Sequence, residues 1–241
     1  MKSNIVLLFI IIYSWSVTDL NAQLILEGQL DLGNNNLSRG VYLQFSNIGY
    51  YERSFWGAQG GYQLGLVQPE NAFFNSWYIN AYGKIPLGKI KLNLGGEYLW
   101  ADFSPYMREI NWIIIASTSL RHWRFVLGNN SRIYRLSRKT ARNDLVADPE
   151  SRIIEAGNVM YSAGFMLKPD ENKWNLTFTI TDYDHFIVQQ ETNPIANIRF
   201  DYKLNEPIRL YSELWYKSTG FFNIRVNYFG TLFRIGMLWN L

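Results

Sequence analysis

The clearest pattern in the sequence is an alternation of apolar and polar side chains at every second position. Between residues 89 and 100, apolar side chains occupy the even positions apart from Gly96, and Lys91, Asn93 and Glu97 lie between them. A β-strand points successive side chains to opposite faces. This period of two therefore predicts a strand with one apolar and one polar face.

The same alternation returns in segments of about ten residues, separated by turn-forming residues such as Gly, Pro and Asn. We count twelve predicted strands. They cover residues 24–30, 41–46, 56–66, 73–82, 89–100, 110–119, 122–130, 158–167, 174–181, 197–203, 208–214 and 222–241. Two joints are ambiguous, the turn near Ser119 and a change of phase at Gly230, so ten or fourteen strands remain alternatives.

The last predicted strand contains that change of phase. Its apolar side chains lie at even positions before Gly230 and at odd positions from Phe233 to Leu241. A slip of one residue at a glycine predicts a β-bulge. The sequence ends inside the alternating pattern, on an apolar and aromatic row.

Alternation does not by itself decide which face of a barrel meets water. In a small soluble barrel the apolar rows fill the interior. We expect the reverse here, because an eight-stranded barrel is already about full of side chains and twelve strands enclose more volume. Aromatic residues also gather towards the ends of the apolar rows, as they do at bilayer interfaces. They are Trp56, Trp100, Trp112, Trp123, Tyr161, Trp174, Tyr202 and Trp239.

The first residues form a separate unit. Lys2 precedes an apolar run over residues 5–17, and Ala22 ends the polar stretch that follows. This is the layout of a cleaved secretory signal peptide, and the run is shorter than the roughly 20 residues of a membrane-spanning helix. We expect a signal peptide over residues 1–22, Sec-type export, and a single barrel domain over residues 23–241.

Composition narrows the classes of function. The chain has no cysteine, which excludes disulfide scaffolds, thiol nucleophiles and cysteine-based metal sites. A net charge of +3 with scattered basic residues gives no nucleic-acid footprint. Aromatic residues make up 17% of the chain and charged residues only 18%, which favours an apolar exterior. We predict no cofactor and no metal site.

The signal peptide, the alternating segments and the aromatic closing strand together resemble small outer-membrane β-barrel proteins of Gram-negative bacteria. The resemblance spans residues 23–241 and concerns architecture, not a catalytic motif. It implies an all-β, antiparallel, up-and-down transmembrane barrel in the cell outer membrane, in contact with lipid and lipopolysaccharide. With both termini periplasmic, the longest connections, near residues 137–156 and 184–194, are then extracellular.

Charged residues on the polar rows are the strongest functional signal. An excess of basic side chains around a water-filled passage favours anions. This predicts a porin-like channel for transport of small polar or anionic solutes, with Arg199 and Arg225 setting selectivity. If the charges pair and plug the interior, the protein is instead a structural or partner-docking barrel of an envelope assembly. The lumen or constriction candidates are Lys91, Glu97, Arg124, Arg132, Arg199, Asp201, Arg209, Glu213, Arg225 and Arg234.

A third hypothesis is a hydrolase at the barrel rim. Asp182, Asp184 and His185 faintly resemble the Asp–His half of an omptin-like protease site, in which the pair activates a water molecule. The second pair of aspartates cannot be placed, and the sequence has no G-x-S-x-G motif, so we assign no catalytic residue. The 137–156 loop carries charges of both signs and is a candidate docking site for an envelope protein partner.

Overall fold

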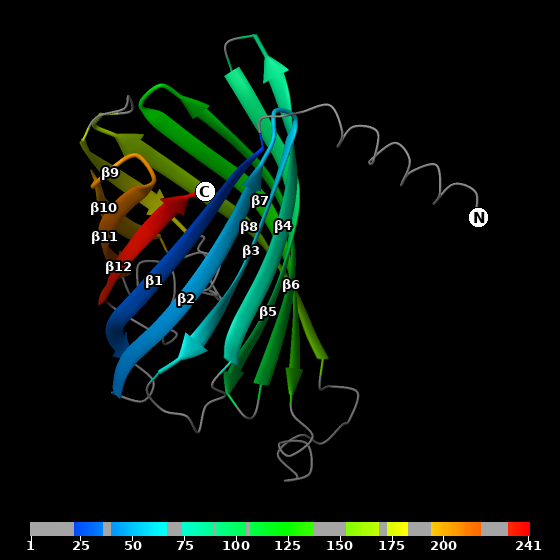
Figure 1. Ribbon diagram of the computed structural model, residues 1–241. Coiled ribbons are helices and arrows are strands. Elements are labelled where there is room, and N and C mark those ends of the chain that lie inside the picture. The colour runs from blue at the N-terminus through cyan, green and yellow to red at the C-terminus, as the bar shows by residue number, and fades with distance from the viewer. Residues whose placement is uncertain are drawn as a thin grey trace, which may run out of the picture.

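The computed structural model describes residues 22–35, 40–66, 74–88, 90–104, 107–136, 153–168, 173–182, 194–217 and 231–241. These residues form twelve strands: β1 (Gln23–Asn35), β2 (Gly40–Glu52), β3 (Trp56–Gly65), β4 (Phe74–Leu87), β5 (Ile90–Ser104), β6 (Met107–Leu120), β7 (Trp123–Leu136), β8 (Ile153–Met166), β9 (Trp174–Thr181), β10 (Ile195–Lys203), β11 (Ile208–Lys217) and β12 (Thr231–Asn240). Each strand pairs with its neighbours in sequence and β12 returns to β1, so the sheet closes into an antiparallel barrel (Figure 1). None of the described residues belongs to a helix long and apolar enough to cross a membrane.

The predicted twelve-stranded antiparallel barrel is confirmed. The ambiguous joint near Ser119 is a tight turn at Arg121 and His122, where Arg121 has a φ of 42°, so β6 and β7 are separate strands. The expected loop 137–156 is too long at its C-terminal side, because Ile153 already pairs with Arg135 of β7. Residues 137–152 and the predicted bulge at Gly230 lie outside the described residues.

The two ends of the barrel differ in their connections. One end, which we name the turn end, carries Gln23, Asn240 and the connections that follow even-numbered strands. The other end, the loop end, carries the connections that follow odd-numbered strands. In Figure 1 the turn end is at the top and the loop end at the bottom.

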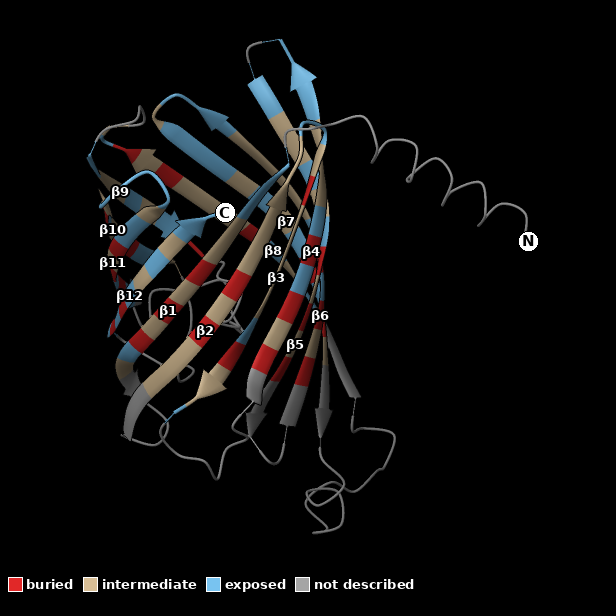
Figure 2. Cartoon of the chain, viewed as in Figure 1, coloured by how far each residue is buried: buried red, intermediate tan, exposed pale blue. Residues whose placement is uncertain are grey.

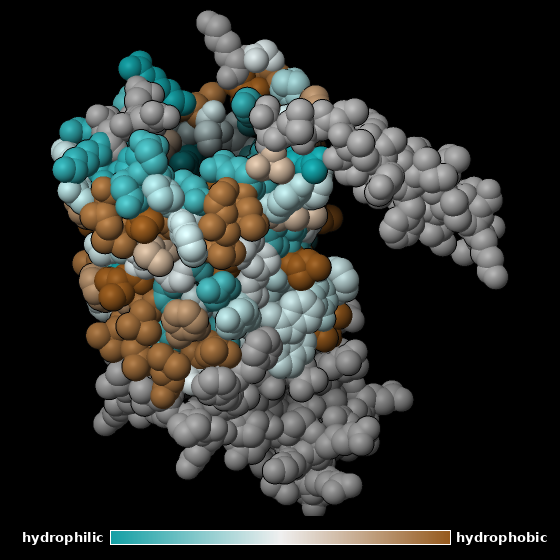
Figure 3. Space-filling model, in the orientation of Figure 1, coloured by the Kyte–Doolittle hydropathy of each residue, from teal (hydrophilic) through white to brown (hydrophobic). Residues whose placement is uncertain are grey.

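The apolar rows face outward, as the sequence predicts. On β5, Leu94 is 44% exposed, whereas Glu97 on the opposite row is 3% exposed. Trp112, Trp123 and Trp239 from the predicted row ends are also among the exposed large side chains. Apolar side chains cover much of the visible barrel wall, and hydrophilic ones gather at its upper rim (Figure 3). A closed sheet with an apolar exterior meets both requirements for a barrel in hydrocarbon.

The inner wall is mainly polar, but it includes an apolar patch that the sequence did not predict. Buried positions recur along the strands (Figure 2) and include many charged and amide side chains. Ile48, Tyr78, Leu99 and Ala101 form a buried hydrophobic cluster from strands β2, β4 and β5. These side chains fall on the inward rows, so the interior is not lined by polar groups throughout.

Glycines on the inner wall make room for tyrosine rings from the next strand. Gly57 of β3 pairs with Tyr82 of β4, and a Cβ at Gly57 would lie 2.5 Å from Cζ of Tyr82. Gly236 of β12 pairs with Tyr211 of β11, whose ring covers it in the same way. Gly57 and Gly61 of β3 therefore lie opposite Tyr82 and Tyr78 of β4, whose rings need the space.

Two consecutive glycines of β5 give a direct test of this close packing. A Cβ at the inward Gly95 would lie 2.6 Å from the backbone oxygen of Ala81 and 2.7 Å from Cβ of Tyr82. At the outward Gly96 the nearest atom would be the Ile113 oxygen, at 3.6 Å. Gly95→Ala should lower the free energy of unfolding by about 1–3 kcal/mol, because backbone must move. Gly96→Ala is the matched control, with little change.

The measurement is urea unfolding of the refolded barrel in detergent micelles, followed by tryptophan fluorescence. Equal unfolding midpoints for the two variants would contradict the packing described for β4 and β5.

Candidate functional site

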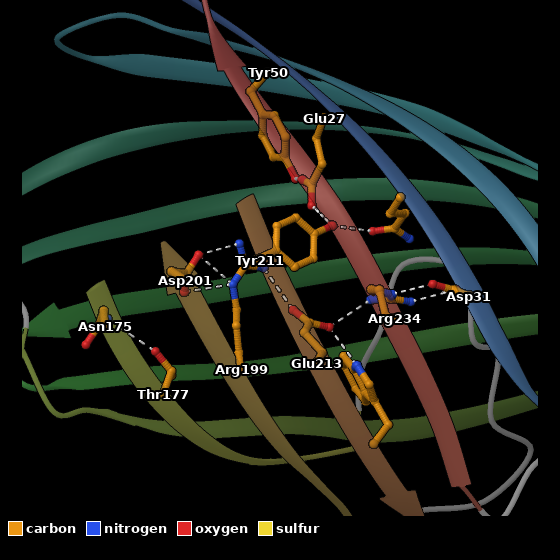
Figure 4. Close-up of polar contacts among 12 residues, drawn as sticks. Glu27, Asp31, Tyr50, Asn175, Thr177, Arg199, Asp201, Tyr211, Glu213 and Arg234 are labelled. Atoms are coloured by element: carbon orange, nitrogen blue, oxygen red, sulfur yellow. Dashed lines mark hydrogen bonds and ion pairs between the residues drawn. The ribbon is translucent and has the colours of Figure 1, made fainter. Parts of the chain in front are cut away.

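The main polar feature of the interior is a row of four alternating charges. Arg199 of β10 lies directly opposite Glu213 of β11, Glu213 opposite Arg234 of β12, and Arg234 opposite Asp31 of β1. We name these four residues the charge ladder. Figure 4 shows them on neighbouring strands, each side chain directed towards the next. Opposite charges that face each other across strands stabilise the sheet.

Arg234 holds the ladder together where the barrel closes. Its Nε donates to Oδ1 of Asp31 at 2.6 Å and its second terminal nitrogen to Oδ2 at 3.0 Å. A third nitrogen reaches Oε2 of Glu213 at 3.4 Å. The same Glu213 oxygen accepts a hydrogen bond from the indole of Trp215 at 2.6 Å. Arg234 is thus shared between two buried carboxylates on the strands that flank it.

Arg199 also binds two carboxylates. Its guanidinium contacts the carboxylate of Asp201 at 3.0–3.1 Å and Oε1 of Glu213 at 2.9 Å. The guanidinium carbon also lies 3.8 Å from the ring centroid of Tyr211, a cation–π contact. Arg199 was predicted to set selectivity, and in the structure its charge is shared between two carboxylates.

A buried carboxylate next to the ladder joins β1 to its neighbours on both sides. Glu27 of β1 accepts hydrogen bonds from the hydroxyls of Tyr50 on β2 and Tyr211 on β11 (Figure 4). The side-chain amide oxygen of Gln29 lies 3.1 Å from the same Tyr211 hydroxyl. Glu27 also interacts electrostatically with Arg199.

Three cations near the turn end form no salt bridge with an acid among the described residues. Arg124 of β7 and Arg209 of β11 are exposed to the interior, as is Lys91 of β5. Lys91 and Arg124 lie in one register row, on either side of Ser119. Arg124 interacts electrostatically with Arg209, Arg199 and Asp201. We name Lys91, Arg124 and Arg209 the basic mouth.

The wall opposite the charge ladder is organised by amides and one buried ion pair. Arg132 of β7 and Glu109 of β6 are 3.6 Å apart, with side chains 5% and 0% exposed. Beside them, Nδ2 of Asn130 donates to Oδ1 of Asn111 at 2.9 Å. Nearer the turn end, Nδ2 of Asn80 donates to Oε2 of Glu97 at 3.2 Å. This wall is therefore less charged than the one formed by β10, β11, β12 and β1.

The structure brings most of the predicted lumen candidates into the interior. Strand register places nine of them on inward rows, whereas Arg225 lies outside the described residues. They do not form one ring, because Arg199, Asp201, Glu213 and Arg234 belong to one paired network. Lys91, Arg124 and Arg209 make no salt bridge among the described residues.

The predicted rim site is described only in part. Asp184 and His185 lie outside the described residues. Asp182, just beyond β9, accepts a hydrogen bond from the backbone N–H of Tyr161 at 2.6 Å, so it holds the end of β9 against β8. Burial raises the pKa of the Asp182 carboxyl, although that hydrogen bond and Arg132 oppose the shift. The described residues contain no group of acids or histidines that could hold a metal ion.

Several acids of the interior were missed by the sequence analysis. Glu27, Asp31, Glu52 and Glu109 all fall on inward rows. Their presence reduces the predicted excess of basic charge, because Asp31 and Glu109 pair with arginines and Glu52 with Lys84. The signal was present on β1, where acids alternate with leucines, but alternation alone does not show which charges will meet.

Comparison with solved structures shows what kind of barrel this is. The NanC porin has a TM-score of 0.52 and 13% sequence identity, over 90% of this chain and 100% of that one. Omp33 of Acinetobacter baumannii matches 93% of this chain and 100% of that one, with 9% identity and a TM-score of 0.45. Outer membrane phospholipase A from Escherichia coli covers 92% and 90%, with 10% identity and a TM-score of 0.45.

The chain has the fold of an outer-membrane β-barrel protein. No protein-family model matches the sequence, and no curated protein shows significant similarity to it. At the low identities of the structural matches, the similarity concerns the fold alone. Function therefore has to be argued from the residues of the barrel interior.

The charge ladder can be tested by removing its central cation. Arg234→Gln leaves Asp31 and Glu213 buried with too little positive charge, and should lower the free energy of unfolding by about 3–5 kcal/mol. The control is Lys203→Gln, because Lys203 pairs with Glu206, whose side chain is 88% exposed. That variant should change stability by less than about 1 kcal/mol.

Both variants are compared by urea unfolding of the refolded barrel in micelles. Adding Asp31→Asn to Arg234→Gln should restore part of the loss, since one unpaired carboxylate is then removed. If Arg234→Gln is as mild as Lys203→Gln, the ladder does not stabilise the closed barrel.

Proposed function

We propose that this protein is an outer-membrane channel for the passive transport of small polar solutes, with a preference for anions. The observation that carries the proposal is the basic mouth, formed by Lys91, Arg124 and Arg209, which make no salt bridge to an acid among the described residues. Cations around a passage that are not held in salt bridges raise the local concentration of anions and lower their barrier to entry.

The outward apolar rows and the closed sheet support a location in the outer membrane, in contact with lipid and lipopolysaccharide. The fold similarity to the NanC porin is consistent with that location, although it does not establish transport. On this proposal, residues 1–22 act as the signal peptide for Sec-type export of a Gram-negative envelope protein. Both termini then lie on the periplasmic side, and the basic mouth is at the periplasmic end of the lumen.

A second candidate function is a non-conducting structural barrel that docks a partner in an envelope assembly. The charge ladder favours it, because paired arginines and acids brace the wall and occupy the interior. The inward cluster of Ile48, Tyr78, Leu99 and Ala101 occupies further space. Docking through residues 137–152 belongs to this proposal. The two candidates differ in whether the barrel conducts ions.

Conductance of the refolded mature chain, residues 23–241, in a planar bilayer tests the proposal. In a salt gradient the reversal potential should show a preference for anions. The double variant Arg124→Gln and Arg209→Gln should reduce the anion-to-cation permeability ratio severalfold, because two uncompensated charges leave the lumen. Arg53→Gln is the control. Nε of Arg53 donates to the hydroxyl of the outward-row Tyr51 at 2.6 Å, so this substitution removes one charge outside the lumen.

Two results would overturn the proposal in different ways. A folded, heat-modifiable barrel that never conducts favours the structural role. A barrel that conducts with unchanged selectivity in the double variant shows that the basic mouth does not control the passage.

A further inference from the structure

The inner wall opposite the charge ladder contains a small recess with a chemistry of its own. The recess has a volume of about 240 Å³ and opens towards the lumen. It is smaller than the range of about 300–1,000 Å³ typical of pockets for drug-sized ligands, so it suits a small solute. The lining residues, from β3 to β7, are Gln59, Asn80, Tyr82, Asn93, Gly95, Ile115, Ser117 and Val126.

None of these lining side chains carries a charge, and most of the polar ones both donate and accept hydrogen bonds. Gln59, Asn80 and Asn93 supply carboxamides, while Ser117 and Tyr82 supply hydroxyls. A carboxamide presents two N–H donors beside an oxygen acceptor. Ile115 and Val126 add apolar surface next to these groups. Such a mixture complements a molecule whose hydroxyls also donate and accept and whose carbon skeleton offers a C–H face.

One buried group in the recess is left without a partner in the described structure. Asn80 is only 6% exposed, and its Nδ2 donates to Glu97, but its Oδ1 has no hydrogen-bond partner there. A buried carbonyl oxygen without a partner is costly, so it favours a ligand that donates a hydrogen bond. Asn93 and Ser117 are joined by a long bond of 3.4 Å, which a ligand hydroxyl can readily replace.

Backbone close packing shapes the floor of the recess. Gly95 lies in the lining, and any side chain there would collide with Ala81 and Tyr82. The absence of a Cβ therefore lets β4 pack closely against β5 beside the recess. The Tyr82 hydroxyl donates to Glu52, which leaves its oxygen able to accept a hydrogen bond.

We propose that this recess binds a small, neutral, polyhydroxylated solute of monosaccharide size. An anion would find no cation in the lining, and an apolar molecule would leave the carboxamides unsatisfied. The lumen then has two functional regions, a basic mouth that attracts anions and an amide recess that holds hydroxyl-rich solutes. The role of the recess in transport rests on the proposed channel, whereas the binding itself does not.

Binding is measured on the refolded chain in lauryldimethylamine oxide micelles by saturation-transfer NMR titration. This detergent is chosen because a sugar-headgroup detergent would compete for the recess. D-glucose and sorbitol are the probes, and glycine betaine, which has no hydroxyl group, is the control solute. The proposal expects saturable transfer to both probes and none to betaine. Absence of a saturable signal from the two probes, or equal binding of betaine, would overturn it.

Substitutions in the lining test whether glucose binds in the recess. Asn93→Leu and Asn80→Leu should each weaken glucose binding about fivefold, the effect of one lost hydrogen bond of about 1 kcal/mol. Asn93→Leu leaves Glu97 and its partner intact, so it keeps the test valid if Asn80→Leu fails to fold. Asn197→Leu is the matched control, because Asn197 is an inward amide on β10, outside the recess. Equal glucose affinity in wild type and Asn93→Leu would show that the recess is not the site.

Conductance measurements with glucose test this inference separately from the proposed channel function. Glucose should reduce the current through wild-type pores saturably and have a much weaker effect on Asn93→Leu. A barrel that binds glucose but never conducts supports binding in the recess and contradicts the proposed channel function. A barrel that conducts but does not bind glucose supports the proposed channel function and contradicts binding in the recess.

Discussion

The closed barrel depends on the pairing of charges across its last and first strands. Asp31 and Arg234 are 203 residues apart in sequence, yet their side chains meet at 2.6 Å where β12 joins β1. Buried ions are costly unless opposite charges satisfy them. The alternation of sign along Arg199, Glu213, Arg234 and Asp31 gives each buried ion an opposite charge on a neighbouring strand. A slip of one residue between β12 and β1 would turn Asp31 outward, so the ladder also fixes the register of closure.

The ion pairs that Arg199 and Arg234 form in the charge ladder have a consequence for the lumen. Arg199 and Arg234 are each held by two carboxylates, so they contribute little net field to the lumen. Arg124 and Arg209 are not so held within the described structure, and Arg124 faces further positive charge. The arginines of the inward rows therefore differ in their partners and not in the face of the strand on which they lie.

The inner wall is also divided by side-chain size. On β3 and β4, glycines receive tyrosine rings, and on β5 Gly95 lets the neighbouring strand approach closely. The amide recess lies on the same part of the wall, and Gly95 and Tyr82 are among its lining residues.

Alternation along the sequence by itself determined the twelve strands, their outward apolar rows and the inward placement of residues such as Lys91 and Arg234. This is possible because the pleat of a strand assigns each residue to a face locally. Tertiary structure alone decided which charges pair, that Ile48 and Leu99 form an inward apolar cluster, and that Arg124 interacts with Arg199 and Arg209 as well as with Asp201. Those outcomes depend on the register between strands, including strands at opposite ends of the chain, which no local pattern specifies.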